Sequence, residues 1–363
     1  MLLQRLLACL LFVAVQSIPA EPRPRLIYPN GLAFDKSDRL HISDIGAHQI
    51  FRLEGTNLAL VAGTGVAGFS GDGEHASRAT LNAPHELLFL ADGTLLIADT
   101  FNHRIRAIRP DGTIHTIVGN GKAGHKGDGG AATEASLDNP QGVAADRAGN
   151  LYIADTFNHV VRRVDTNGII STFAGKEAGL AGDGGPADKA QISLPLAVAV
   201  GPDGAVYISD GGNSRIRRVS ADGTITTIMG FGPGSGNGGA GFSGDGGVAS
   251  KAKLFSAGDL KFDAAGKLWI SDSGNNRVRL LSNGVVMSIA GSGEAAFKGD
   301  GGPAILANFN APQKVAVHPD GSIYIADRAN QRVRRVDPAG RVDTVAGELN
   351  PSGVMLNLPN PAP

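Results

Sequence analysis

Cysteine is almost absent from this chain of 363 residues, which contains a single one, Cys9. Because Cys9 lies in the N-terminal apolar segment, the rest of the chain can use neither disulfide bonds nor thiolate chemistry. Neither sign of charge dominates: 33 basic residues stand against 34 acidic ones, and this balance disfavours nonspecific attraction to nucleic acid. Long apolar runs are also missing. The longest, residues 6–15, is about half of the roughly twenty residues that a membrane span needs.

The N-terminus has the features of a secretory signal peptide. Arg5 supplies a positive charge, residues 6–15 are apolar, and Ser17-Ile18-Pro19-Ala20 offers a small-residue cleavage site. A lipoprotein signal at Cys9 is the alternative, but Cys9 precedes most of the apolar run. We therefore predict a signal peptide at residues 1–20, a secreted or periplasmic location, and a short N-terminal lead at residues 21–28.

A repeat of about fifty-five residues fills most of the remaining chain. Its phase is marked by six aspartates at intervals of 55, 56, 55, 62 and 55 residues: Asp44, Asp99, Asp155, Asp210, Asp272 and Asp327. The residue fifteen positions before each of them is proline in five copies and alanine in the other: Pro29, Pro84, Pro140, Pro195, Ala257 and Pro312. The 52 glycines suit a chain built largely of tight turns. Such a fixed period indicates a repeat architecture.

Each repeat contains four short runs with the character of strands. They are rich in β-branched and aromatic residues and are separated by Asp-Gly or Asn-Gly turns, which is typical of β-hairpins. The third run alternates arginine with apolar residues, as in Arg104-Ile105-Arg106, and the fourth ends in glycine, as in Thr116-Ile117-Val118-Gly119. Six such repeats predict an all-β fold: a six-bladed β-propeller of four-stranded antiparallel blades with long inter-blade links. We place the propeller at residues 29–349 and a Pro-rich C-terminal tail at residues 350–363.

The repeats resemble a known family. The pattern of Pro140-Gln141-Gly142-Val143-Ala144, Leu151-Tyr152-Ile153-Ala154-Asp155, Asn158 and Val161-Arg162 is similar to the NHL repeat. The link at residues 179–187, Gly-Leu-Ala-Gly-Asp-Gly-Gly-Pro-Ala, resembles that of bacterial and teneurin-like NHL propellers. The resemblance implies the propeller fold and leaves the activity open, because such propellers include protein-binding and RNA-binding modules, extracellular sensor domains and an amidating lyase.

The alternating strand directions of a blade place the long links on one face of the propeller, where we expect function. Each of five links contains a Gly-Asp-Gly turn, with aspartates at positions 72, 128, 183, 245 and 300. We expect each aspartate to bond the backbone of its own turn. Calcium binding is the alternative, but one regular carboxylate per link falls short of the six to eight oxygens that calcium needs. An alanine pair three residues apart in each link, such as Ala132 and Ala135, predicts a short helical turn.

The marker aspartates have regular polar companions. In five repeats an asparagine follows the aspartate by three residues and an arginine by seven, as with Asp155, Asn158 and Arg162. Blade one has Ala47 in place of the asparagine. We interpret the set as a repeated structural ion pair or turn cap that holds the scaffold.

Residues that depart from the repeat are better indicators of function than the repeated residues, which hold the scaffold. The two positions after the proline or alanine that precedes each marker aspartate by fifteen residues begin the innermost strand, at the mouth of the expected central channel. They carry the candidate ligand-binding residues Asn30, His85, Glu86, Gln141, Asp259, Gln313 and Lys314. Glu86 and Asp259 belong to blades that face each other across the axis, so we expect them to line one polar pocket with Lys314 and His85.

Two enzyme hypotheses follow from this pocket. The first is a metal-dependent lactonase-like hydrolase, in which channel carboxylates and amides hold a divalent cation. The second is a zinc site like that of the amidating lyase, which in that family requires several channel histidines. His85 alone among the nine histidines occupies such a position, so the second hypothesis is the weaker.

We favour a binding module over an enzyme. The expected partner is an extracytoplasmic protein, peptide or glycan, bound on the elaborated face by a monomer that needs no cofactor. Phe69, Phe242 and Phe297 in the links are candidate apolar anchors. The longer interval between Asp210 and Asp272 reflects a Gly-rich excursion at residues 231–241, which is a further candidate contact. No strand exchange between the termini is expected. We expect residues 25–28 and the tail to seal the last blade against the first.

Overall fold

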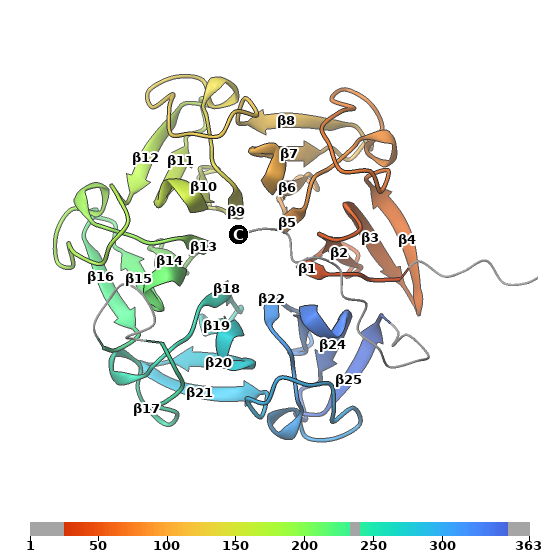
Figure 1. Ribbon diagram of the computed structural model, residues 1–363, viewed down its shortest axis with the longest axis vertical. Coiled ribbons are helices and arrows are strands. Elements are labelled where there is room, and N and C mark those ends of the chain that lie inside the picture. The colour runs from red at the N-terminus through yellow and green to blue at the C-terminus, as the bar shows by residue number, and fades with distance from the viewer. Residues whose placement is uncertain (1–24, 233–239, 348–363) are drawn as a thin grey trace, which may run out of the picture.

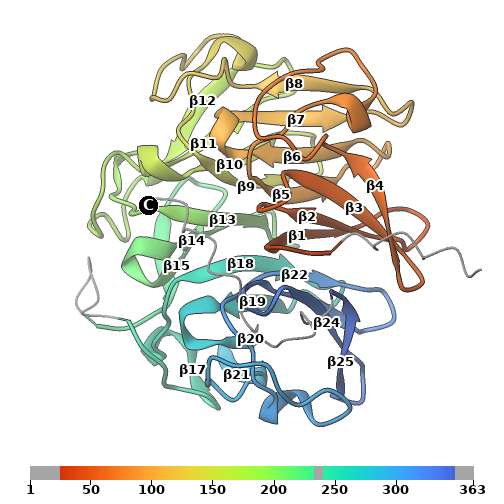
Figure 2. The ribbon, with the colours of Figure 1, turned by 45° about the vertical axis from the view of Figure 1, so that its right-hand side comes forward.

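The computed structural model describes residues 25–232 and 240–347. The predicted signal peptide, the first residues of the lead, most of the Gly-rich excursion and the tail lie outside the described residues. Six blades surround a central axis, with the first strand of each blade innermost and the fourth outermost (Figure 1, Figure 2). The predicted six-bladed all-β propeller is therefore confirmed. Among the described residues, no helix is both long and apolar enough to cross a membrane.

The strands follow the predicted order in all six blades. Blade 1 contains β1 (Pro29–Phe34), β2 (Leu40–Asp44), β3 (Gln49–Glu54) and β4 (Asn57–Ala62). Blade 2 contains β5 (Pro84–Phe89), β6 (Leu95–Asp99), β7 (Arg104–Ile108) and β8 (Ile114–Val118). Blade 3 contains β9 (Pro140–Ala145), β10 (Leu151–Asp155), β11 (Val160–Val164) and β12 (Ile170–Ala174).

The second half of the ring repeats the arrangement. Blade 4 contains β13 (Pro195–Val200), β14 (Val206–Asp210), β15 (Arg215–Val219) and β16 (Ile225–Met229). Blade 5 contains β18 (Ala257–Phe262), β19 (Leu268–Asp272), β20 (Arg277–Ser282) and β21 (Val285–Ala290), with a two-residue strand β17 (Gly247–Val248) paired to the outer edge of β21. Blade 6 contains β22 (Pro312–Val317), β23 (Ile323–Asp327), β24 (Arg332–Val336) and β25 (Val342–Ala346).

Short 3-10 helices occupy two positions of the repeat. In the links they are η1 (Ala76–Arg78), η3 (Ala132–Glu134), η5 (Ala187–Lys189), η7 (Ala249–Lys251) and η9 (Ala304–Leu306), which confirms the predicted helical turns. After the second strand they are η2 (Thr100–Asn102), η4 (Thr156–Asn158), η6 (Gly211–Asn213), η8 (Ser273–Asn275) and η10 (Arg328–Asn330). The alanines of the link helices are buried between neighbouring blades, as Ala132 and Ala135 show.

The hydrophobic core is divided among the seams between blades. In the seam of blades 2 and 3, Leu96, Ile105 and Val118 pack against Val143, Ile153 and Ile170, with the link residue Leu137 between them. The seam that closes the ring contains Leu26 of the lead together with Leu32 of blade 1 and Val333 of blade 6. The lead residue Leu26 therefore packs in the seam between the last blade and the first, as predicted, and within the described residues β1–β4 and β22–β25 each form a complete sheet without exchange of a strand.

The marker aspartates hold each blade to the link that precedes it. Asp155 is fully buried and accepts hydrogen bonds from the Asp138 backbone N–H at 2.6 Å and the Asn158 Nδ2 at 2.8 Å. Arg162 Nη1 lies 3.5 Å from Asp155 Oδ2. Four other blades repeat this arrangement, with Asp99, Asp210, Asp272 and Asp327. The ion pair predicted from the sequence is confirmed, whereas the aspartate side chains of blades 2 to 6 do not cap the helical turns that they precede.

Candidate functional site

Four charged side chains meet near the central axis, where the innermost strands of blades 2, 5 and 6 carry them. Lys314 Nζ lies 2.7 Å from Glu86 Oε2 and 3.5 Å from Asp259 Oδ1. The other oxygen of the same carboxylate, Glu86 Oε1, lies 2.9 Å from Lys261 Nζ. Asp259 Oδ2 also accepts the Val315 backbone N–H at 2.9 Å. We call these four residues, Glu86, Asp259, Lys261 and Lys314, the channel cluster.

The strand geometry explains how the cluster forms. Glu86, Asp259 and Lys314 occupy the third position of β5, β18 and β22, which are the innermost strands of blades 2, 5 and 6. Blade 1 has Gly31 at the equivalent position, where an added Cβ would lie 2.1 Å from the His85 carbonyl oxygen. The missing side chain on blade 1 therefore allows blades 1 and 2 to approach closely beside Glu86.

The neighbouring lysines keep the carboxyl group of Glu86 ionised. Burial alone would raise the pKa of Glu86, but the ammonium groups of Lys261 and Lys314 outweigh it and hold that pKa below its usual value. Burial alone would lower the pKa of Lys261, yet the carboxylates of Asp259 and Glu86 raise it. Burial raises the pKa of Asp259. The two ammonium groups and two carboxylates thus balance each other in a site with little access to water.

The sequence placed three of the cluster residues correctly and missed one. Lys261 lies two positions after Asp259 in the same strand, and the period of two in a strand puts both side chains on one side. That spacing was the signal from which Lys261 could have been found.

The other predicted channel residues do not join the cluster. His85 Nδ1 is 2.9 Å from the Ala83 carbonyl oxygen, and burial lowers the pKa of His85 to about 3, so its imidazole is neutral. Asn30 is buried, and within the described residues its Oδ1 has no hydrogen-bond partner. Gln141 and Gln313 are half-buried at the first channel position of their blades. The imidazole of His85 therefore bonds the backbone just before its own strand rather than the channel cluster, and the expected pocket that includes His85 is not observed in residues 25–232 and 240–347.

A second departure from the repeat lies at the channel mouth, and the sequence analysis missed it. Arg328 occupies the position where Thr100, Thr156 and Ser273 donate their hydroxyls to the carbonyl of the next blade's proline. Its guanidinium carbon lies 5.7 Å from the centroid of the Tyr28 ring. Burial lowers the pKa of Arg328. Comparison of the η positions across repeats would have revealed it.

The lactonase hypothesis requires a set of side chains that can hold a divalent cation. Within the described part of the chain, no three His, Cys, Asp or Glu side chains gather as a metal-ligand group. Both carboxylate oxygens of Glu86 are engaged by lysine ammonium groups. A cation would have to displace those two positive charges, so the channel cluster does not fit a metal.

The link aspartates have different partners from those predicted. Asp128 Oδ1 accepts a hydrogen bond from Arg162 Nη2 at 2.5 Å, and Asp128 Oδ2 accepts from Thr172 Oγ1 at 2.7 Å. Arginine pairs with the link aspartate in the same way in four other blades, at Asp72, Asp183, Asp245 and Asp300. The prediction that each aspartate bonds its own turn was wrong, because a fully buried arginine of the following blade requires a carboxylate.

Aromatic rings collect on the face that carries the links. Phe69 and Phe242 are 43% and 41% exposed, and Arg104 and Arg277 stack over them at 3.8 and 4.1 Å. Phe297 is half-buried under Arg332. Phe101, Phe157 and Phe255 add three more exposed rings. The Phe101 backbone N–H bonds the Asn82 carbonyl at the end of its link, which places this ring on the same face.

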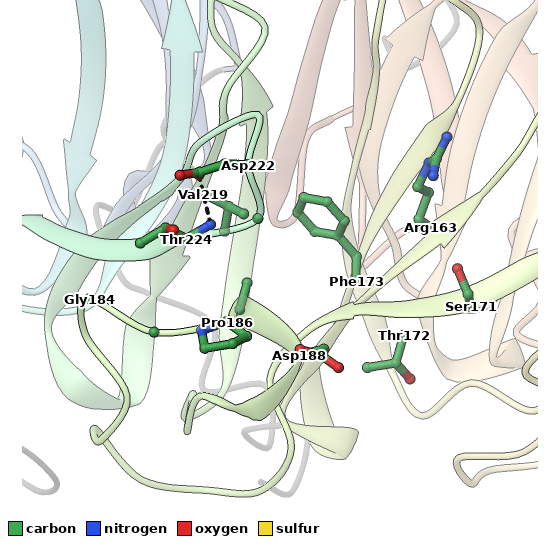
Figure 3. Close-up of a pocket in the computed structure, with 13 residues that line it drawn as sticks. Arg163, Ser171, Thr172, Phe173, Gly184, Pro186, Asp188, Val219, Asp222 and Thr224 are labelled. Atoms are coloured by element: carbon green, nitrogen blue, oxygen red, sulfur yellow. Dashed lines mark hydrogen bonds between the residues drawn. The ribbon is translucent and has the colours of Figure 1, made fainter.

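Grooves also lie between neighbouring blades. The groove between blades 3 and 4 has a volume of about 450 Å³ and is lined by Phe173, Pro186 and Asp222, among others (Figure 3). Similar grooves of about 360 and 340 Å³ lie between blades 4 and 5 and between blades 1 and 2. Since the groove recurs with the repeat, we assign it to the scaffold.

Comparisons with known proteins agree with this geometry. The family model of the teneurin NHL domain matches residues 120–181, and the NHL repeat model matches residues 309–336. The chain is an NHL-repeat propeller. This NHL propeller is 32% identical to mouse teneurin-1 over 234 residues, or 58% of this chain and 8% of teneurin-1. It is 28% identical over 346 residues to Protein SUPPRESSOR OF QUENCHING 1, chloroplastic, from Arabidopsis thaliana, which covers 92% of this chain and 32% of that protein.

Solved structures share the fold of this NHL propeller. An auxiliary nutrient binding protein from Bacteroides thetaiotaomicron has a TM-score of 0.61 at 16% identity, with 89% of this chain and 70% of that chain covered. A putative gluconolactonase has a TM-score of 0.55 at 15% identity, with 90% and 93% covered. At such identities the similarity is one of fold. The chain spans a small part of the length of both curated relatives.

Proposed function

We propose that this NHL propeller is a binding module that recognises a protein, peptide or glycan on the face that carries the links. The observation that carries the proposal is the set of exposed rings there, led by Phe69 and Phe242 under their stacked arginines. Aromatic residues and arginine are the types most enriched at binding hot spots. Their loops are fixed to a rigid scaffold by buried Asp–Arg pairs, which reduces the entropy lost on binding.

The lactonase alternative has weaker support. Its central requirement is a carboxylate free to hold a cation, whereas Glu86 and Asp259 are engaged by Lys261, Lys314 and the Val315 N–H. The gluconolactonase-like structure shares only the fold at 15% identity.

We place the module in the secreted or periplasmic compartment because of the predicted signal peptide at residues 1–20. The test of location is N-terminal sequencing of the protein recovered from its native host. A mature N-terminus at Glu21 supports export, whereas retention of Met1 in the cytoplasmic fraction contradicts it.

Binding is tested with a glycan array and a phage-displayed random peptide library. We expect at least one class of ligand to be retained, and the double variant Phe101→Ser and Phe157→Ser to weaken its binding at least tenfold. Ile169→Ser is the matched control, because Ile169 is 39% exposed, like Phe101, but lies in the turn before β12 rather than in one of the turns that carry the phenylalanine rings. Equal loss in the control, or no loss in the double variant, would contradict the proposal.

Lactone hydrolysis is measured on the same preparations. Turnover that disappears in Glu86→Gln would favour the alternative and overturn the binding-module proposal. Binding without turnover is the expected result.

A further inference from the structure

Each link pairs with the outer edge of the blade that follows it. In blade 3, the Gly129 N–H donates to the Ile170 carbonyl at 2.8 Å and the Ile170 N–H donates to the Gly130 carbonyl at 3.0 Å. Blades 2, 4 and 6 have the same pair of bonds at Ile114, Ile225 and Val342, and β17 covers β21 in blade 5. The edges of β8, β12, β16, β21 and β25 are thereby covered.

The side chains of these pairings are polar. As described for blade 3, the link aspartate bonds a fully buried arginine of the third strand and a hydroxyl of the fourth strand, Arg162 and Thr172. Blade 6 repeats the arrangement with Asp300, Arg334 and Thr344.

Blade 1 differs at every one of these positions. Within residues 25–232 and 240–347 no segment pairs with the outer edge of β4. Phe51 stands where the other blades have the buried arginine, and Leu60 stands where Thr172 and Thr344 lie. Leu60 is 46% exposed, and Leu58 is half-buried although its counterparts Ile114 and Ile170 are 0% exposed. β4 therefore combines an open hydrogen-bonding edge with an apolar surface, and open edges favour strand addition.

The glycine that follows the fourth strand of blade 6 has the same backbone conformation as the glycine that begins each link. Gly347 has φ +89° and lies against the Gln331 carbonyl, as Gly119, with φ +94°, lies against the His103 carbonyl. Asp128 lies nine residues after Gly119 and Leu356 lies nine residues after Gly347. The tail thus offers a leucine where a link has its aspartate, which matches the change from arginine and threonine to Phe51 and Leu60.

A second correspondence supports the same register. Pro303 begins the helical turn of the last link, twelve residues after Gly291, and Pro359 lies twelve residues after Gly347. We propose that the C-terminal segment at residues 354–359 is the sixth link: it adds to the open edge of β4, and Leu356 packs on Phe51 and Leu60.

Disulfide trapping tests the register, because Cys9 is the only cysteine and is replaced by serine in every variant. The test pair is Asn57→Cys with Pro359→Cys in the full chain. Its matched reference is Ile169→Cys with Ala131→Cys, which occupy the equivalent positions of blade 3 and form a bridge there. Ile169→Cys with Pro359→Cys is the mismatched control.

We expect mild oxidation to link the test pair within one chain to an extent similar to the reference pair, and to leave the mismatched pair unlinked. Peptide mass spectrometry and non-reducing electrophoresis measure the linkage. A reference pair that links while the test pair does not would overturn the proposal. A disulfide between two chains would assign the edge to a second copy and would also overturn it.

Hydrogen exchange provides a second readout. Leu356→Asp should increase the exchange rate of the amides in β4 at least tenfold, while β12 is unchanged. Adding Phe51→Arg and Leu60→Thr recreates the polar partners of a link aspartate and should restore the protection. Rapid exchange of β4 in the unaltered chain would show an uncovered edge and overturn the proposal.

Discussion

Lys261 donates a hydrogen bond to Glu86 at 2.9 Å across the channel, although 175 positions separate the two residues in the sequence. The contact joins blade 5 to blade 2, and Lys314 joins blade 6 to the same carboxylate. Buried ion pairs of this kind add little net stability when intact but cost several kcal/mol when one partner is removed. The channel cluster thus links blades 2, 5 and 6, because each buried charge is compensated only while its partners on the other blades are present.

Removal of the shared carboxylate should therefore be costly. Glu86→Gln leaves two lysines without their common partner, and we expect a loss of about 3–5 kcal/mol in the free energy of unfolding. Urea denaturation at pH 7 measures it. Asp92→Asn, at an exposed turn, is the control and should change stability by less than about 0.5 kcal/mol. A Glu86 variant as stable as this control would contradict the role assigned to the cluster.

The stability of the propeller should depend on pH through Asp155. Burial raises the pKa of Asp155 to about 7 in the folded state, from 3.8 for the free side chain. The folded state then holds a proton that the unfolded state has lost, so this contribution is fully present below pH 3.8 and disappears as the pH rises through 7. We expect the stability of the wild type relative to Asp155→Asn to fall by on the order of 2 kcal/mol between pH 5 and pH 8. A difference that does not change between these two pH values would show that Asp155 is already ionised at pH 5.

The link aspartates should matter more than ordinary surface charges. Asp128→Ala removes the charged hydrogen bond to the fully buried Arg162, and we expect a loss of about 2 kcal/mol in unfolding free energy. Asp188→Ala, in the same type of link, breaks only the exposed pair with Lys189 and should cost under about 1 kcal/mol. Thermal or urea unfolding distinguishes the two. Equal effects would mean that burial of the arginine does not set the strength of the pair.

The close approach of blades 1 and 2 should make Gly31 intolerant of a side chain. An added Cβ would lie 2.1 Å from the His85 carbonyl and 2.8 Å from Ser43 Oγ, and the carbonyl is backbone that cannot rotate away. We expect Gly31→Ala to cost more than about 3 kcal/mol. Gly168→Ala, with open space around it and φ +77°, should cost about 1–2 kcal/mol from backbone strain alone. Similar losses for the two variants, measured by urea unfolding, would contradict the close contact.

Much of the scaffold could be predicted from the sequence, because its signals are local and repeated. The set of Asp155, Asn158 and Arg162 lies within eight residues and recurs in five blades, so its spacing alone indicated the ion pair that the structure has. The helical turns of the links were predicted in the same way, from alanines three residues apart.

The partners of Asp128 were beyond the reach of the repeat pattern. Its carboxylate bonds Arg162 and Thr172, which lie 34 and 44 positions away and belong to the next blade. Nothing in the link itself distinguishes an aspartate that caps its own turn from one that reaches across a seam. The burial of the arginine decides between them, because a buried guanidinium must find a carboxylate.

The sequence by itself determined the number of blades, the order of their strands and the face on which the links lie, since each follows from a short period repeated along the chain. Only the tertiary structure decided that Glu86, Asp259, Lys261 and Lys314 neutralise one another and that the edge of β4 is left open among the described residues. Both depend on which blades meet across the channel and at the closing seam. Closure of the ring brings together residues from distant repeats, and the free energy of burying their charges depends on those neighbours rather than on local sequence.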